Sequence, residues 1–174
     1  MSPRAVLVGL PGAGKTTTGR RLASRLRVAF ADSDALVEQR AARSVREIFA
    51  ADGEDAFRVL EAEVIAEALA RFDGVLALGG GAVITRSTRD ALVAGSAPVI
   101  LLRSSVRALT RRVGSGRDRP LLTGDTASKL RLLATAREPL YREVATHVVR
   151  TDHRSSSRVA AEIVELLGHR ATQS

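Results

Sequence analysis

A glycine-rich segment, GLPGAGKT, occupies residues 9–16 and begins in the last two residues of the apolar run AVLVGL at residues 5–10. It matches the pattern G-x-x-x-x-G-K-[ST] in full. An apolar run of this length is typical of a strand that is buried on both faces of a parallel sheet. The segment from Lys15 onward places Leu22 and Leu26 on one side, which is typical of an amphipathic helix. The motif therefore lies between a strand and a helix, the context in which it forms a phosphate-binding loop.

The residue types in this loop suit the phosphates of a nucleotide. Glycines allow successive backbone N–H groups to turn toward phosphate oxygens, and the free N–H groups at the start of the next helix add positive potential. Lys15 is expected to reach the outer phosphates, and the Thr16 hydroxyl is expected to bind Mg²⁺. The alternative, an ordinary glycine-rich turn with a solvated lysine, is disfavoured because the motif and its context agree. The predicted nucleotide-binding residues of the loop are Gly12, Ala13, Gly14, Lys15, Thr16 and Thr17.

Strand-like and helical patterns alternate along the rest of the chain. Further strands are predicted within residues 27–34, 74–84, 97–103 and 144–150. Helical patterns separate them, and one of these, from Leu130 to Arg137, is expected to end at the boundary set by Pro139. Such alternation specifies a parallel sheet with helices on both faces. The sequence therefore predicts a single-domain α/β fold of the P-loop NTPase type, with a five-stranded parallel sheet.

Composition limits the remaining classes of protein. A chain of 174 residues, 45% of them hydrophobic, fits one domain with a substantial core. The chain contains no cysteine, which excludes a disulfide framework, a thiolate metal site and a cysteine nucleophile. It has neither an apolar run long enough to span a membrane nor the apolar region of a signal peptide, so we expect a cytoplasmic protein without a membrane partner.

The net charge is +8, and arginine supplies nearly all of the positive charge. A basic surface can attract nucleic acid, but aromatic residues make up only 3% of the chain and no basic block is interleaved with stacking side chains. We therefore expect no nucleic-acid partner. A basic balance also suits an enzyme that handles several phosphates and a carboxylate.

Two aspartates, Asp32 and Asp34, follow the predicted second strand. The carboxyl ends of parallel strands form the edge where ligands gather, and strand alternation would point both side chains in a common direction. One carboxylate can hold Mg²⁺ through water, and the other can accept a hydrogen bond from a hydroxyl that becomes phosphorylated. Asp34 can also serve as a helix N-cap, and the two roles are compatible. Because no guanine-reading N-K-x-D motif is present and the chain is small, these features favour a small-molecule kinase.

Along nearly its whole length the sequence resembles the shikimate kinase family. The resemblance implies a fold like that of nucleoside monophosphate kinases and transfer of the γ-phosphoryl group of MgATP to the 3-hydroxyl of shikimate, in aromatic amino-acid biosynthesis. It also implies a monomer. We expect a kinase domain over residues 1–168, with a lid loop at about 113–125 and a flexible tail at 169–174. The segments that carry the resemblance are GLPGAGKTTTGRRLA, DSDALVEQR, SVREIFAADGEDAFRVLEAEV, LALGGGAV, RPLL and REPLY.

The resemblance assigns roles on the acceptor side of the site. It implies that Asp34 binds ring hydroxyls and acts as the base, and that Asp32 helps to hold Mg²⁺. Arg58 and Arg137 match the arginines that bind the substrate carboxylate, a role that suits the paired donors of a guanidinium. The alternatives are an exposed helix charge for Arg58 and a helix-end cation for Arg137. Glu61, three residues after Arg58, could steady it on the same helical face.

The resemblance also assigns the walls of the shikimate pocket. Residues 79–81 are three consecutive glycines, Gly79, Gly80 and Gly81, which allow a substrate to approach the main chain; the alternative is an ordinary wide turn. Phe49 and Phe57 match apolar pocket walls, although either could equally belong to the core.

On the nucleotide side, Arg119 matches the lid arginine that approaches the transferring phosphate, and Arg117 is a weaker candidate for the same role. Arg112 matches the arginine that stacks beside adenine. The chain departs from the family where many members place a proline against the other adenine face. It has HRSSS there, so Ser155 is our candidate at that position and the adenine clamp is left open.

Two other functions remain as alternatives. One is a different small-molecule kinase of similar fold, such as a gluconate kinase or a nucleoside monophosphate kinase. Asp34, the two arginines and the glycine triplet argue against it. The other is a basic regulatory or nucleic-acid-binding ATPase, whose binding would weaken steeply with salt.

Overall fold

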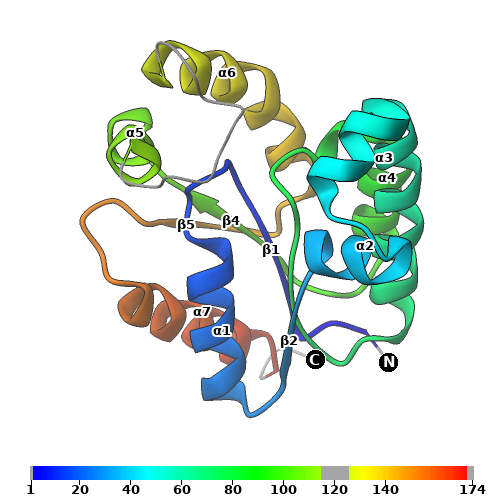
Figure 1. Cartoon of the computed structure of the whole chain (residues 1–174). Helices are drawn as coiled ribbons and strands as arrows, with labels where there is room; N and C mark the ends of the chain where they lie inside the picture. The colour runs from blue at the N-terminus through cyan, green and yellow to red at the C-terminus, as the bar shows by residue number, and fades with distance from the viewer. Residues whose placement is uncertain (1, 115–125, 172–174) are drawn as a thin grey trace.

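Five parallel strands form the central sheet, in the spatial order β2-β3-β1-β4-β5. The structure is a computed structural model that describes residues 2–114 and 126–171 (Figure 1). All four strand pairings are parallel, which confirms the predicted sheet. The strands are β1 (Ala5–Val8), β2 (Ala29–Asp32), β3 (Gly74–Ala77), β4 (Val99–Arg103) and β5 (His147–Arg150).

Helices cover both faces of this sheet. Figure 1 shows α1 and α7 packed together on one side, and α2, α3 and α4 grouped on the other. The helices are α1 (Lys15–Leu26), α2 (Ser33–Ala41), α3 (Val45–Arg71), the 3-10 turn η1 (Ala82–Ile84), α4 (Arg86–Ala94), α5 (Val106–Gly114), α6 (Thr126–Val144) and α7 (Ser156–Ala171). No helix in the described part of the chain is long and apolar enough to cross a membrane.

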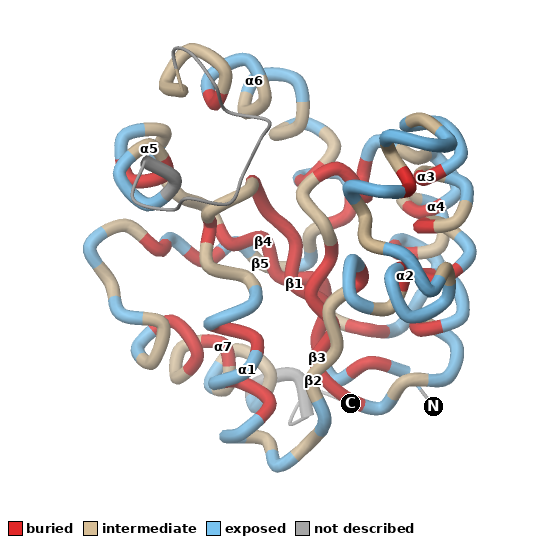
Figure 2. The backbone as a smooth tube through the Cα atoms, in the orientation of Figure 1, coloured by how far each residue is buried: buried red, intermediate tan, exposed pale blue. Residues whose placement is uncertain are grey.

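The core lies along the central strands. All four residues of β1 and of β3 are buried, as is most of β4, whereas the edge strands β2 and β5 are only partly buried (Figure 2). A strand with neighbours on both sides and helices on both faces has no solvated surface, so its residues are all apolar. The position of β1 in the sheet thus explains the continuous apolar run that precedes the phosphate-loop motif.

A second, smaller core joins α2 to α3 and consists of Val37, Ile48, Phe57 and Val64. Phe49 packs against it, with its ring centroid 4.7 Å from that of Phe57. The two phenylalanines, considered above as pocket walls or core, therefore share a core contact, and Phe57 is 2% exposed. This core fixes the part of α3 from which Arg58 extends.

Two predicted boundaries differ in the structure. Helix α6 continues through Pro139 to Val144, whereas the sequence predicted an end before the proline. Proline removes the N–H that would bond the carbonyl four residues earlier, that of Thr135. Both Thr135 and Pro139 are exposed, so water can replace the missing bond.

At the other boundary, α7 extends through Ala171, three residues into the segment expected to be a tail, and residues 172–174 lie outside the described part.

Gly74 offers a test of how tightly β3 is packed at its start. A Cβ added there would lie 2.5 Å from the Phe72 ring and also against the Ala29 carbonyl oxygen of β2, so the backbone of a neighbouring strand would have to shift. We expect Gly74→Ala to lower the free energy of unfolding by roughly 1–3 kcal/mol. The matched control is Gly168→Ala in α7, where the added Cβ would meet no described atom beyond its chain neighbours and its own helix backbone. We expect this control to be neutral or to stabilise by up to about 1 kcal/mol. Equal denaturant midpoints for the two variants would contradict the prediction.

Candidate active site

The phosphate-loop motif forms a tight turn between β1 and α1. Gly12 and Gly14 adopt φ of +83° and +89°, a backbone conformation that residues other than glycine rarely adopt. Gly14 is the N-cap of α1 and, as a glycine, has no side chain that could cap this end of the helix. The first N–H groups of α1 are therefore left for a ligand, and an anion is the ligand that a helix N-terminus prefers.

Lys15 bends back over the loop. Its Nζ donates to the carbonyl oxygens of Gly9, at 2.7 Å, and of Leu10, at 3.0 Å. These bonds hold the ammonium group directly over the turn, where an anionic phosphate would compete with the two carbonyls. Gly12, Gly14 and Lys15 of the predicted phosphate loop therefore lie around one turn.

Asp32 connects the phosphate loop to α2. Its Oδ2 accepts from the Thr16 hydroxyl at 2.9 Å, and its Oδ1 accepts from the backbone N–H of Asp34 at 3.0 Å. Asp32 is therefore the N-cap of α2, and Asp34 lies in the first turn of that helix. This corrects two sequence-based expectations, that Asp34 is the cap and that strand alternation aligns the two side chains.

The oxygens of Thr16 and Asp32 fit Mg²⁺, which prefers one or two protein oxygens and completes its shell with water and phosphate. Within residues 2–114 and 126–171, no group of three or more His, Cys, Asp or Glu side chains could hold a metal by itself. The residues present therefore suit a metal that is shared with a bound nucleotide.

Asp34 lies in a crowded, partly buried environment. Burial raises the pKa of its carboxyl above the ordinary range, and the nearby Asp32 charge adds to the shift. The charges of Lys15 and Arg58 oppose it. A carboxylate of raised pKa is a better proton acceptor than an exposed aspartate.

Arg58 is 17% exposed and forms an ion pair with Glu61, whose side chain is 1% exposed; the Nη1 to Oε2 distance is 2.5 Å. A weaker contact of 3.4 Å joins Arg58 to Glu54. Burial raises the pKa of Glu61, and the adjacent Arg58 opposes the shift. Arg58 Nε and Glu61 Oε1 are buried without a hydrogen-bond partner among the described residues. The alternative of an exposed helix charge does not hold for Arg58.

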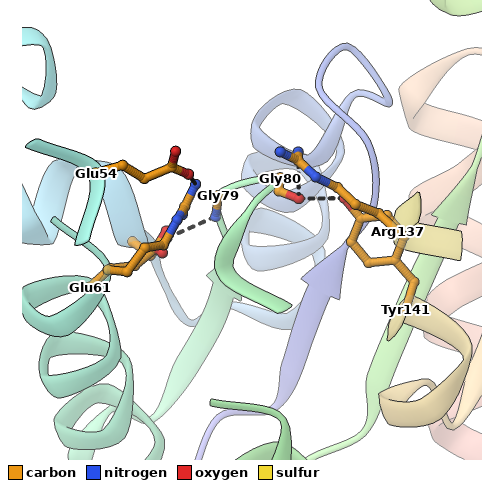
Figure 3. Close-up of polar contacts among 8 residues, drawn as sticks. Glu54, Glu61, Gly79, Gly80, Arg137 and Tyr141 are labelled. Carbon is orange, nitrogen blue, oxygen red and sulfur yellow. Dashed lines mark hydrogen bonds and ion pairs between the residues drawn. The ribbon is translucent and has the colours of Figure 1, made fainter. Parts of the chain in front are cut away.

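Three contacts fix the turn at Gly79–Gly81. The Ser33 hydroxyl accepts from the Gly79 N–H at 2.8 Å. The Gly80 carbonyl accepts from Arg137 Nη1 at 3.0 Å and from the Tyr141 hydroxyl at 2.5 Å. Figure 3 shows Arg137 and Tyr141 reaching Gly80 from one side, with Glu54 and Glu61 on the other. Arg137 therefore binds the turn, and because α6 continues to Val144 it is not the helix-end cation of the alternative interpretation.

Steric limits explain why this turn consists of glycines. A Cβ at Gly79 would lie 2.7 Å from Asp34 Oδ1, and one at Gly80 would lie 2.8 Å from the Pro11 Cδ in the phosphate loop. A Cβ at Gly81 would overlap the Arg58 guanidinium. The triplet is therefore the point where the phosphate loop, α2 and α3 meet, and an ordinary wide turn would not need three glycines.

Arg112 links the phosphate loop to the residues that follow β4 and β5. It donates to the Gly12 carbonyl at 3.3 Å, to the Ser104 hydroxyl at 3.3 Å and to the Thr151 carbonyl at 3.2 Å. Ser155 caps α7, since its hydroxyl accepts from the Arg158 N–H at 3.3 Å. Arg112 therefore lies beside the phosphate loop, and its expected contact with adenine stays a prediction. Ser155 caps α7, a structural role in addition to any contact with a nucleotide.

The lid residues Arg119 and Arg117 lie outside the described residues, as does most of the predicted lid at 113–125. Conversely, the sequence analysis missed Ser33 and Tyr141. Ser33 lies between Asp32 and Asp34, and nothing in this short segment indicates that its hydroxyl has a remote backbone partner. Tyr141 lies four residues after Arg137, a spacing that shares one helical face, but the helix was expected to end before Pro139.

Known proteins are similar to this chain over almost its whole length. The family model for shikimate kinase matches residues 11–168. Shikimate kinase from Mycobacterium marinum is 51% identical over 168 residues, which cover 96% of this chain and 90% of the relative. Shikimate kinase from Mycobacterium avium is 50% identical over 168 residues, which cover 96% of this chain and 94% of the relative. A solved structure, shikimate kinase from Acinetobacter baumannii in complex with shikimate, has a TM-score of 0.90 at 36% identity, covering 98% of this chain and 94% of the other.

The raised pKa of Asp34 predicts how stability depends on pH. The folded protein binds this proton more tightly than the unfolded chain does, so stability falls as pH rises from the ordinary aspartate pKa through the raised one. An asparagine does not titrate. We therefore expect Asp34→Asn to gain free energy of unfolding relative to the wild type as pH rises through this window.

Denaturant unfolding at about pH 3 and at neutral pH measures this difference on either side of the ordinary aspartate pKa. The matched control is Asp55→Asn, which changes an exposed carboxylate on α3 and should stay within about 0.5 kcal/mol of the wild type. A difference between Asp34→Asn and the wild type that does not grow with pH would refute the prediction.

Proposed function

Because the chain belongs to the shikimate kinase family, we propose that the edge of the sheet around Gly79–Gly81 binds MgATP and shikimate side by side. The enzyme is an ATP-dependent kinase that phosphorylates the 3-hydroxyl of shikimate, giving shikimate 3-phosphate and ADP in aromatic amino-acid biosynthesis. The observation that carries the placement of the two substrates is the glycine triplet. It contacts the phosphate loop on one side and the Asp34 and Arg58 side chains on the other.

The ATP donor lies on the phosphate loop in this proposal. The backbone N–H groups of residues 12–17 and the Lys15 ammonium neutralise the phosphates, and Lys15 exchanges its carbonyl partners for phosphate oxygens. Arg112 borders the adenine from the side of β4 and β5. Its three contacts with the surrounding chain support this role because they fix the plane of its guanidinium.

Thr16 and Asp32 would hold Mg²⁺ beside the phosphates. The metal, when bound, supplies positive charge that neutralises the phosphoryl oxygens during transfer. The Asp32 carboxylate also holds the first turn of α2, so the metal-binding residue and the acceptor-binding residue Asp34 are joined by one hydrogen bond.

The acceptor is bound through its carboxylate and its hydroxyls. Arg58 and Arg137 hold the carboxylate, and Asp34 accepts a hydrogen bond from the hydroxyl that is phosphorylated. The Glu61 ion pair fixes Arg58 before the substrate arrives, and the raised pKa of Asp34 favours transfer of the hydroxyl proton to it. Phosphoryl transfer depends mostly on positioning and charge neutralisation, so a strong base is not needed.

Arg119 completes the proposal as the lid cation that approaches the transferring phosphoryl group. A cation that arrives with a closing loop neutralises charge only when both substrates are bound, and closure keeps out water, a competing acceptor. This role stays a prediction from the family resemblance.

We also propose a monomer that works in the cytoplasm. Residues of one chain, from the phosphate loop, α2, α3, the glycine turn and α6, supply both substrate contacts. No second copy is therefore needed to complete the site. Both substrates of the reaction are small metabolites that a cytoplasmic enzyme can reach directly.

The test of this function is a coupled ADP-release assay of the purified protein with MgATP. Shikimate, gluconate, AMP and no acceptor are compared in parallel. We expect turnover with shikimate alone. Turnover with gluconate or AMP instead would keep the kinase and reject the acceptor site. Slow hydrolysis that no acceptor stimulates, with salt-sensitive binding of a polyanion, would favour the regulatory ATPase.

The carboxylate contact predicts the effect of Arg58→Lys. Lysine keeps the charge but loses the paired donors of the guanidinium and its fit to Glu61. We expect kcat/KM for shikimate to fall roughly 10- to 100-fold, the loss of charge-assisted hydrogen bonds, while the KM for ATP changes little. The matched control is Arg46→Lys, an exposed arginine earlier in α3. Wild-type shikimate kinetics in Arg58→Lys would remove Arg58 from the site.

A further inference from the structure

The Gly80 carbonyl has two donors that come from one helix. Arg137 and Tyr141 lie one turn apart in α6 and both donate to this oxygen, at 3.0 Å and 2.5 Å (Figure 3). On the preceding residue, the Gly79 N–H donates to the buried Ser33 hydroxyl. The glycine turn is therefore held from the side of α6 and from the side of α2, in both cases by side chains.

The two donors to the Gly80 carbonyl differ in whether they would keep this hydrogen bond when shikimate binds. Arg137 is part of the proposed carboxylate site, so binding draws its guanidinium toward the substrate and away from a carbonyl. Tyr141 has no such second task, because its side chain is 1% exposed and its ring belongs to the main core. Burial raises the pKa of Tyr141 to about 12, so its hydroxyl keeps its proton and stays a donor at neutral pH.

We propose that Tyr141 is a positioning residue, whose hydroxyl holds the Gly80 peptide and thereby leaves Arg137 able to turn to the carboxylate of the acceptor. Ser33 is its counterpart at Gly79. This inference rests on the proposed function, since it takes the carboxylate site as given. In this proposal neither hydroxyl contacts the acceptor. Both hold the backbone of the turn, and the Tyr141 hydroxyl also interacts directly with the Arg137 side chain.

The geometry favours this role over packing alone. A phenylalanine would fill the same space in the core, but the Gly80 carbonyl would then depend on Arg137. In the free enzyme Arg137 would satisfy that oxygen, and the substrate would have to break the bond and leave a partly buried carbonyl without a partner. Such an unpaired group is costly, so the substrate would bind more weakly. ATP, on the phosphate loop, would be unaffected.

The first experiment is steady-state kinetics of Tyr141→Phe with MgATP and shikimate. We expect the KM for shikimate to rise roughly 5- to 30-fold, as for one unsatisfied, partly buried carbonyl, with the KM for ATP and kcat changed less than about twofold. The matched control is Thr135→Val. It removes a hydroxyl from the same helix, where that hydroxyl donates to the Arg131 carbonyl, and it should leave both KM values unchanged. An unchanged shikimate KM in Tyr141→Phe would overturn the inference.

A double-mutant cycle separates positioning from a general loss of structure. In an Arg137→Ala background the Gly80 carbonyl has no arginine to lose, so Tyr141→Phe should change shikimate affinity less than about twofold. Shikimate affinity is measured without turnover, as the shift in thermal midpoint on adding shikimate. If Tyr141→Phe weakens binding equally in both backgrounds, the tyrosine acts by structure alone and the inference is wrong.

The outcomes also separate this inference from the proposed function. If the wild-type protein does not use shikimate, the proposed function fails before any variant is compared, and this inference, which depends on it, falls too. If the wild type is active, the variants decide the inference alone. Should Tyr141→Phe fail to fold, Ser33→Ala tests the same turn from its other end, and a shikimate KM unchanged in that variant would overturn the proposal.

Discussion

The parallel register of three neighbouring strands is the constraint on which the site depends. Leu7 of β1 pairs with Ala77 of β3, and Ala77 also pairs with Asp32 of β2, so these residues form one row across the sheet. Two residues beyond this row the chain reaches Gly9, Gly79 and Asp34. The phosphate loop, the glycine turn and the acceptor carboxylate are therefore brought to one level by backbone hydrogen bonds that involve none of their side chains.

Close approach then limits what side chains the edge can carry. The glycine turn has Asp34, Pro11 and Arg58 around it, one against each residue. These neighbours come from three elements, the phosphate loop, α2 and α3, so a single methyl group at any of the three glycines would push one part of the site away. The absence of side chains here allows the donor and acceptor sites to meet, which a reaction that depends on positioning requires.

The charges at this edge are arranged at a cost in stability. Burial raises the pKa of both Asp34 and Glu61, because the charged form of each carboxyl is less stable in the protein than in water. The positive charge of Arg58 lowers the pKa of both carboxyls and so offsets part of the cost. Such a cluster of titratable groups with shifted pKa values, held beside a basic side chain, is typical of a functional site.

Local patterns in the sequence determined the phosphate loop, the order of strands and helices, and the family. Each depends on spacing within a few residues or on a continuous motif, and the structure confirms the sheet that they imply. They failed at two helix boundaries, where more than one local rule applies. Asp32, not Asp34, caps α2, and α6 continues through Pro139, past the end that local rules assign to it.

Only the tertiary structure showed that Ser33 and Tyr141 hold the glycine turn, because these bonds join residues 46 and 61 positions apart in the chain. A hydroxyl in a buried serine or tyrosine looks the same in the sequence whether its partner is water, its own helix or a remote carbonyl. Its role is fixed only when the sheet brings the remote backbone within hydrogen-bonding distance.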